Sequence, residues 1–161
     1  VLSANGPKRM TITMLRDSAA DVMAQADLYG MLRYQDFGGT PADRAAGAAW
    51  LGRVLPGARA ECSLVCPGIH SVLAALLSQL ARPGELVCVE ALTYPGLKAI
   101  ATQIGVLLHA LPLDDEGPSA TALEQACRTL KPKALVINPT LANPTTVTTS
   151  MARREALADV A

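Results

Sequence analysis

Three separated stretches of the chain carry residue types suited to holding a small ligand. The first is Cys66-Pro67-Gly68-Ile69-His70-Ser71, which joins an apolar run at 62–66 to a helical pattern at 69–81. A helix that begins at a glycine presents several unbonded backbone N–H groups at one place, with the positive end of the helix dipole behind them. Such a place suits a phosphate, although a chain that simply turns a corner uses the same residues.

The second and third stretches also follow strand patterns. Tyr94 comes directly after the strand pattern at 86–90, where an aromatic ring can stack on a flat ligand and gain about 0.5–1.5 kcal/mol beyond area burial. The alternative is a packing tyrosine at a helix start. Residues 138–146 are rich in Pro and Asn, so the backbone path is fixed while the Asn143 amide can donate a hydrogen bond to a ligand oxygen. A structural Asx-turn would use the same residues.

The elements that must position these stretches alternate between strand and helix. Strand patterns cover 62–66, 86–90, 106–111 and 134–137, and helical patterns cover 69–81, 95–104, 120–130 and 150–160. Short β-rich runs alternating with amphipathic runs predict an α/β fold with a mostly parallel sheet and crossover helices. Ligands of such sheets bind beyond the carboxyl ends of the strands. The loops of interest are 67–71, 91–95, 112–118 and 138–150.

The N-terminal third has a different pattern. Residues 1–9 are polar, and apolar positions then recur at helical spacing over 12–31. A turn-rich loop follows at 34–39. Thr40 can cap a further helix that has Pro41 at its first position and ends near residues 56–57.

Composition excludes several classes of protein. A chain of 161 residues that is 50% hydrophobic can bury one real core. Lys and Arg (14) balance Asp and Glu (14) without a basic stripe, so nucleic acid is not an expected partner of this segment. No apolar run reaches the roughly 18 residues of a membrane span, and no signal-peptide layout opens the chain.

The four cysteines show no pairing pattern that indicates a metal site. Cys62, Cys66, Cys88 and Cys127 form no Cys-x-x-Cys pair and have no histidine at zinc spacing. We expect the three that lie in apolar strand-like runs, Cys62, Cys66 and Cys88, to be small buried hydrophobes, as free cysteines usually are, in a reducing, cytoplasmic setting.

Taken in order, the motifs resemble the large-domain core of the fold-type I, pyridoxal-phosphate-dependent aminotransferases of class I/II. The resemblance depends on Gly-Ile-His opening a helix, Thr-Tyr-Pro-Gly after the next strand, and Asn-Pro-Thr before Arg153 and Arg154. The aminotransferase-like domain of GntR/MocR-type transcriptional regulators is more similar still, because its sequence motifs closely resemble residues 89–96 and 143–146. The resemblance runs from about Leu32 to Ala161.

The resemblance implies pyridoxal 5'-phosphate as the cofactor. Backbone groups of Gly68, Ile69 and His70 would hold its phosphate. Tyr94 would stack on the pyridine ring, and Asn143 would donate to the phenolic oxygen.

The resemblance also implies a homodimer. Tyr34 is similar to the family tyrosine that reaches across a dimer interface to the phosphate of the neighbouring subunit. Two positions depart from the family pattern. Many members have Gln where His70 stands, and Thr146 replaces the Gly of the commoner Asn-Pro-Thr-Gly.

Family members place three further residues beyond the point where this chain stops: an Asp that pairs with the pyridinium nitrogen, the Schiff-base lysine, and an Arg that grips the substrate carboxylate. No lysine of this chain lies in a matching Ser-rich context, and surface positions are expected for Lys8, Lys98, Lys131 and Lys133. Arg153 and Arg154 are expected to decorate a helix.

We therefore assign no catalytic residue. We expect residues 32–161 to be the first half of a cofactor-binding large domain, preceded by an entry segment and helix at 1–31. The chain alone is predicted to be inactive.

Two hypotheses of function follow. In the first, the complete protein transfers an amino group between an amino acid and a 2-oxo acid, which are its small-molecule partners. In the second, the same fold senses the cofactor or an effector and transmits that state to a DNA-binding module outside this chain. A cofactor-free α/β domain is the third alternative. No membrane partner is expected.

Overall fold

A computed structural model describes residues 9–25, 27–34 and 37–161. The chain divides into two compact units, Val1–Val65 and Cys66–Ala161. The division expected from the sequence, into 1–31 and 32–161, stays a prediction.

The first unit contains short helices. They are α1 (Arg9–Gln25), α2 (Leu28–Met31), α3 (Pro41–Leu51) and the 3-10 helix η1 (Ala60–Cys62). The start of α3 confirms the predicted cap, because Thr40 Oγ1 accepts the Asp43 N–H (3.2 Å) and the Asp43 carboxylate accepts the Thr40 N–H (2.9 Å). The pattern at 12–31, however, forms two helices and not one.

The strand predicted at 62–66 is wrong. Its first residue ends η1, the next residue, Ser63, is extended, and residues 63–66 belong to no strand. The Val65 N–H donates to the Gly38 carbonyl (2.8 Å), and a Cβ at Gly38, whose φ is +90°, would lie 2.6 Å from Leu64 Cδ2. These apolar residues therefore lie against a glycine turn, which offers no second strand for them to pair with.

The second unit is built on a parallel sheet. Its strands are β1 (Leu86–Glu90), β2 (Leu107–Leu111) and β5 (Ala134–Val136), and the spatial order is β2-β1-β5. Both neighbours run parallel to β1, with Val87 opposite Leu108 on one side and Ala134 on the other. The predicted α/β class with a mostly parallel sheet is confirmed.

A small antiparallel hairpin, absent from the sequence prediction, follows β2. It consists of β3 (Leu113–Asp114) and β4 (Gly117–Pro118). Gly117 has a φ of +107°, a backbone conformation that favours glycine, and it lies in the segment 112–118 that the sequence indicated as a loop.

Four helices of the second unit begin close to where the sequence predicts them: α4 (Ile69–Leu80), α5 (Pro95–Ile104), α6 (Ala120–Thr129) and α7 (Met151–Val160). Side-chain caps fix two of these starts, because Ser119 Oγ accepts the Ala122 N–H (3.2 Å) and Ser150 Oγ accepts the Arg153 N–H (3.3 Å).

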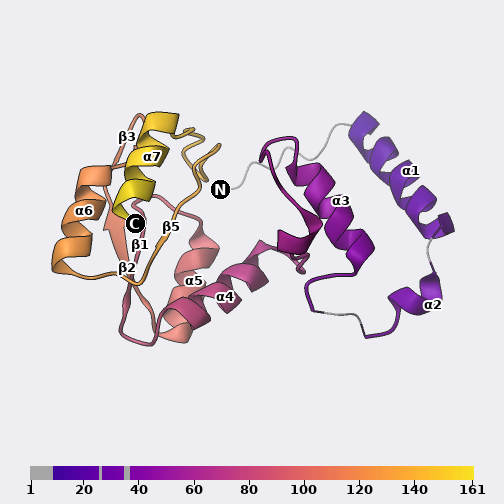
Figure 1. The fold of residues 1–161 in the computed structure, drawn as a ribbon, viewed down its shortest axis with the longest axis horizontal. Coiled ribbons are helices and arrows are strands. Elements are labelled where there is room, and N and C mark those ends of the chain that lie inside the picture. The colour runs from indigo at the N-terminus through magenta and orange to yellow at the C-terminus, as the bar shows by residue number, and fades with distance from the viewer. Residues whose placement is uncertain (1–8, 26, 35–36) are drawn as a thin grey trace. The chain divides into compact units, whose positions relative to one another are not determined.

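The alternation of side chains along β1 divides the core in two. Val87 and Val89 face one side, where they pack with Leu77 of α4 and Leu97 of α5. Cys88 faces the other side, in a cluster whose buried members are Cys88, Leu111, Leu123, Ala126 and Leu157. Figure 1 shows the result, with α4 and α5 on one side of the sheet and α6 and α7 on the other.

Within the described residues, no helix has the length and apolar character needed to cross a membrane.

Candidate functional site

The strand order places the loops after β1 and β5 next to a crevice. The chain leaves β1 for β2 on one side and later returns to β5 on the other side of β1. In parallel sheets the crevice at such a reversal of strand order, beyond the carboxyl ends of the strands, is the usual ligand position. The two loops concerned are 91–94 and 137–150.

A cavity of about 450 Å³ lies at this edge. That volume falls in the range of small-molecule sites, roughly 300–1,000 Å³. Most of its wall is apolar, with a few polar groups and one aromatic ring, and all of it belongs to the second unit. The lining residues are Ile69, Leu73, Thr93, Tyr94, Leu97, Val136, Ile137, Asn138 and Asn143.

The start of α4 forms one side of this cavity. Gly68 precedes the helix with a φ of +91°, and nothing lies within 4 Å of the place where a Cβ would stand. This backbone conformation favours glycine, because residues that carry a side chain rarely adopt it. The first amides of α4, at Ile69 and His70, have no carbonyl one turn back to bond with. They are donors at the positive end of a helix.

Tyr94 lies at the start of α5 and is half-buried. Its ring meets the His70 ring edge to face, with the centroids 6.5 Å apart and the planes perpendicular. The backbone of Gly96 lies directly beneath the tyrosine ring, because a Cβ at residue 96 would be 2.3 Å from ring carbon Cε1. The tyrosine is thus fixed between the start of α4 and the first turn of its own helix.

Asn143 lies near the tip of a loop with its own hydrogen-bond ladder. The Thr149 N–H donates to the Pro139 carbonyl (2.9 Å), and the Ala142 N–H donates to the Val147 carbonyl (2.8 Å). The turn at the tip closes with the Thr146 N–H donating to the Ala142 carbonyl (2.6 Å). This hairpin-like loop holds the half-buried Asn143 against the cavity.

The structure brings together most of the site residues that the sequence singled out. Ile69, Tyr94 and Asn143 line one cavity, and His70 contacts Tyr94. Gly68 sets the start of the helix that carries Ile69. Tyr34 belongs to the first unit and is fully exposed, and its role stays a prediction, as do the binding roles of the others.

Glu90 lies next to the cavity residue Asn138 and was not predicted from the sequence as part of the site. It ends β1, is 3% exposed, and accepts the Asn138 N–H on Oε2 (3.2 Å). Burial raises the pKa of the Glu90 carboxyl, and the backbone hydrogen bond from Asn138 only partly opposes this. The available signal was a carboxylate ending an otherwise apolar strand run.

Arg153 and Arg154 lie on α7, as the sequence predicts, and both also bond to neighbouring segments, which the sequence did not indicate. Arg153 Nη2 donates to Asp114 Oδ2 (2.9 Å), and its Nη1 donates to the Pro118 carbonyl (3.0 Å). The hydrogen bonds that Asp114 accepts, first from Arg153 and then from the Glu116 N–H, lower the pKa of its carboxyl. Arg154 Nη2 donates to the Pro139 carbonyl (2.7 Å), inside the loop that carries Asn143.

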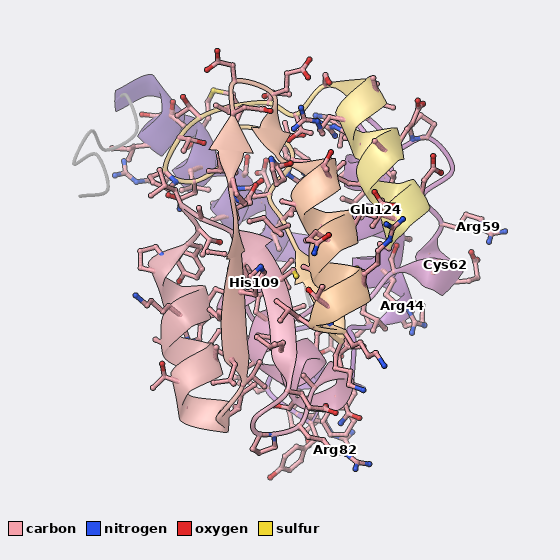
Figure 2. All side chains as sticks on the ribbon, turned by 90° about the vertical axis from the view of Figure 1, so that its left-hand side faces the viewer. Arg44, Arg59, Cys62, Arg82, His109 and Glu124 are labelled. Atoms are coloured by element: carbon pink, nitrogen blue, oxygen red, sulfur yellow. The ribbon has the colours of Figure 1, made fainter. Side chains whose placement is uncertain are left out.

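The remaining candidates stay outside the cavity. His109 is half-buried on the edge strand β2 (Figure 2). Cys88 is buried as predicted, but Cys62 and Cys66 are exposed, so the prediction of burial is wrong for them. Figure 2 shows Cys62 beside Arg59, whose Nη2 donates to Sγ (3.4 Å). No cluster of three or more potential metal ligands occurs among the described residues.

The family is shown by comparison with known proteins. The chain matches the family "Aminotransferase class I and II" over residues 1–161. The chain belongs to this family, which confirms the family resemblance predicted from the sequence.

Curated relatives include both regulators and an enzyme. The chain is 34% identical over 97 residues to the uncharacterized HTH-type transcriptional regulator YdeF of Bacillus subtilis. The aligned residues make up 60% of this chain and 21% of that protein. It is 30% identical over 107 residues to the aminotransferase swnA of Arthroderma benhamiae. That alignment covers 63% of this chain and 22% of the relative.

Solved structures of aminotransferases share the fold. An archaeal alanine:glyoxylate aminotransferase superposes with a TM-score of 0.81 at 27% identity, over 92% of this chain and 38% of that one. Kynurenine aminotransferase from Pyrococcus horikoshii gives a TM-score of 0.77 at 26% identity, with the same coverage of 92% and 38%. The chain thus spans about a fifth of the curated relatives' length and less than two fifths of these structures.

Proposed function

We propose that residues 66–161 form a pyridoxal 5'-phosphate site within an aminotransferase-like protein that moves an amino group between an amino acid and a 2-oxo acid. The observation that carries this proposal is the convergence of Ile69, Tyr94 and Asn143 on one cavity at the carboxyl edge of the sheet. The family membership supports it.

The chemistry of the cavity fits a flat aromatic phosphate ester. The free amides at the start of α4, from Ile69 and His70, are suited to bind the phosphate. Gly68, whose own N–H donates to the Cys66 carbonyl (2.8 Å), forms the turn that precedes them. Tyr94 is suited to stack on the ring, and the Asn143 amide to donate to the phenolic oxygen. Apolar walls exclude water from the ring face, which strengthens the polar contacts inside.

When bound, the cofactor supplies an electron sink for charge that develops on the amino acid. The residues of this chain bind and orient it and take no part in proton transfer. Among the described residues, the cavity lining contains no lysine, and Lys98, Lys131 and Lys133 are exposed, while Lys8 lies outside the described residues. We infer that the Schiff-base lysine lies outside this chain and that the chain alone is inactive.

A second candidate function is supported by the relatives that are named as regulators. YdeF of Bacillus subtilis and YjiR of Escherichia coli, which is 29% identical over 103 residues, are both named HTH-type transcriptional regulators. In this alternative the same cavity is the cofactor- and effector-sensing site of a GntR/MocR-type regulator, and DNA is bound through another module.

The assembly and location are also proposed. Tyr34 is exposed, which leaves its side chain free to reach the site of a second copy in a homodimer. A cytoplasmic location fits the free cysteines among the described residues. Sedimentation of the full-length protein decides between dimer and monomer.

Cofactor binding is tested by adding pyridoxal 5'-phosphate to the full-length protein. We expect a visible absorption band that borohydride abolishes. Tyr94→Ala should weaken cofactor retention, while Tyr94→Phe should keep most of it because the stacking surface remains. Tyr29→Ala, at an exposed tyrosine of the first unit, is the matched control. No band with the wild-type protein would remove both candidate functions.

The two functions are separated by turnover. The cofactor-loaded protein is incubated with a panel of amino acids and 2-oxo acids, and amino-group transfer is followed by chromatography. Transfer supports the enzyme. Cofactor binding without transfer, together with cofactor-dependent DNA binding, supports the regulator.

A further inference from the structure

Arg154 contacts both arms of the loop that carries Asn143. From α7 its Nε donates to the Thr149 carbonyl (2.9 Å), and its Nη2 donates to the Pro139 carbonyl (2.7 Å) and to Thr140 Oγ1 (3.0 Å). The side chain is half-buried. One guanidinium therefore closes the base of the loop from a rigid element of the fold.

Hydrogen bonds between the two arms of the loop connect its fixed base to its tip. The Pro139 carbonyl accepts the Thr149 N–H as well as the Arg154 group. One step closer to the tip, the Leu141 N–H donates to Thr148 Oγ1 (3.2 Å), and the ladder continues through Ala142 to Asn143. Thr149, at the base, is 3% exposed, so a loosened base has no solvent to replace its hydrogen bonds.

We propose that Arg154 is a positioning residue that holds Asn143 at the cavity wall. This inference rests on the proposed cofactor site, because Asn143 matters there as the donor to the phenolic oxygen. An arginine suits the task, since its planar group presents several donors in a fixed fork, whereas a lysine offers a single flexible point charge.

Arg153 provides a matched control on the same helix. Its guanidinium contacts Asp114, Glu116 and the Pro118 carbonyl, at the β3–β4 hairpin. Loss of Arg153 removes an arginine and a comparable set of hydrogen bonds, none of which is made to the Asn143 loop.

The test uses the full-length protein with pyridoxal 5'-phosphate as the probe. The dissociation constant and the pH titration of the bound cofactor's visible absorption are measured for Arg154→Gln, Arg154→Lys, Arg153→Gln, Asn143→Ala and the double variant Arg154→Gln/Asn143→Ala. We expect Arg154→Gln to weaken binding roughly tenfold, the loss of about one hydrogen bond. The titration midpoint should move in the direction that Asn143→Ala moves it.

The double variant decides whether Arg154 acts through Asn143. If it does, the double variant binds no more weakly than Asn143→Ala alone, because the two residues belong to one unit. Arg154→Lys should recover part of the affinity, and Arg153→Gln should leave the titration midpoint unchanged.

Two outcomes overturn the inference while leaving the cofactor site intact: losses that multiply in the double variant, or an Arg154→Gln titration equal to that of the wild type. A wild-type protein that binds no cofactor instead overturns the proposed function, and this inference with it. A merely structural role would lower stability without moving the titration midpoint.

Discussion

The ring of Tyr94 folds back over the backbone of Gly96, so that a Cβ at residue 96 would lie 2.3 Å from ring carbon Cε1. Contacts that short do not occur, so any side chain at this position must displace the ring. Gly96 lies in the first turn of α5 without a left-handed backbone, and the reason for a glycine here is therefore space. The small residue lets the tyrosine lie at the cavity wall.

Gly96→Ala is predicted to displace the Tyr94 ring and to destabilise the protein by about 1–2 kcal/mol, the usual cost of overpacking less a small gain in helix propensity. Urea unfolding and near-ultraviolet circular dichroism of the full-length protein measure the two effects, and cofactor retention should fall as well.

Gly47→Ala is the matched control for Gly96→Ala. Gly47 lies inside α3, and the nearest atom to its new Cβ would be Val65 Cγ2 at 3.7 Å, an ordinary contact. This variant should gain up to about 1 kcal/mol from helix propensity. Equal gains in the two variants would show that the tyrosine ring moves without cost.

The sequence predicts the local features of the fold well, because their causes are local. The caps at Thr40, Ser119 and Ser150 are each formed with a residue three positions further on, so the helix starts can be found from neighbouring residues alone. The apolar run at 86–90 is long enough to predict the central strand.

Partner-dependent features were not predictable. The residues 62–66 have the apolar character of a strand, but a strand also needs a neighbour, and Val65 has only the Gly38 carbonyl of a turn beside it. The acceptors of Arg154 lie 5 to 15 residues away, and two of them are backbone carbonyls, which carry no sequence signature. Tyr94 and Asn143 were found because they follow the ends of β1 and β5, whereas Arg154, which contacts the Asn143 loop, lies on a helix and follows no strand end.

Thr146 has a φ of +61°, in the left-handed region where a β-branched residue is strained. Thr146→Gly is therefore predicted to raise the free energy of unfolding by about 0.5–1 kcal/mol, which is the relief of strain less the entropy that glycine adds to the unfolded chain. Thr146→Val keeps the branched side chain and should gain nothing.

Lys131→Gly tests the same backbone argument away from the cavity. Lys131 follows α6 with a φ of +53°, the position after a helix end that glycine commonly fills. It should gain stability to a similar extent without changing cofactor retention. A loss of stability in both glycine variants would contradict the assignment of strain.

Glu90→Gln is predicted to raise stability at neutral pH by an amount on the order of 1 kcal/mol, because it removes a buried charge while the side-chain oxygen still accepts the Asn138 N–H. Burial raises the pKa of Glu90 above its ordinary value of 4.5. The folded protein therefore binds this proton more tightly than the unfolded chain, and the free energy of unfolding falls as the pH rises from 4.5 through the folded-state pKa.

Urea unfolding of the wild type and Glu90→Gln across this pH range measures the difference. The two curves should meet at low pH, where Glu90 is protonated, and separate as the pH rises. Glu155→Gln, on an exposed position of α7, is the control that should follow the wild type throughout. A Glu90→Gln protein that is less stable at pH 7 would show that the charge itself holds Asn138.

Asp114 should give the opposite pH dependence. Its pKa is lowered from 3.8, first by the side-chain hydrogen bonds from Arg153 and then by the Glu116 N–H. The unfolded chain binds this proton more tightly, so the stabilisation is present above 3.8 and is lost as the pH falls through the folded-state pKa. Asp114→Asn should lower the melting temperature at pH 7 by only about 1–2 °C, since the pair is partly exposed and screened.

Asp115→Asn, at the next, exposed position, should change nothing. A deficit in Asp114→Asn that persists unchanged into strong acid would mean that the asparagine disturbs the β3–β4 turn instead of removing a charge from Arg153.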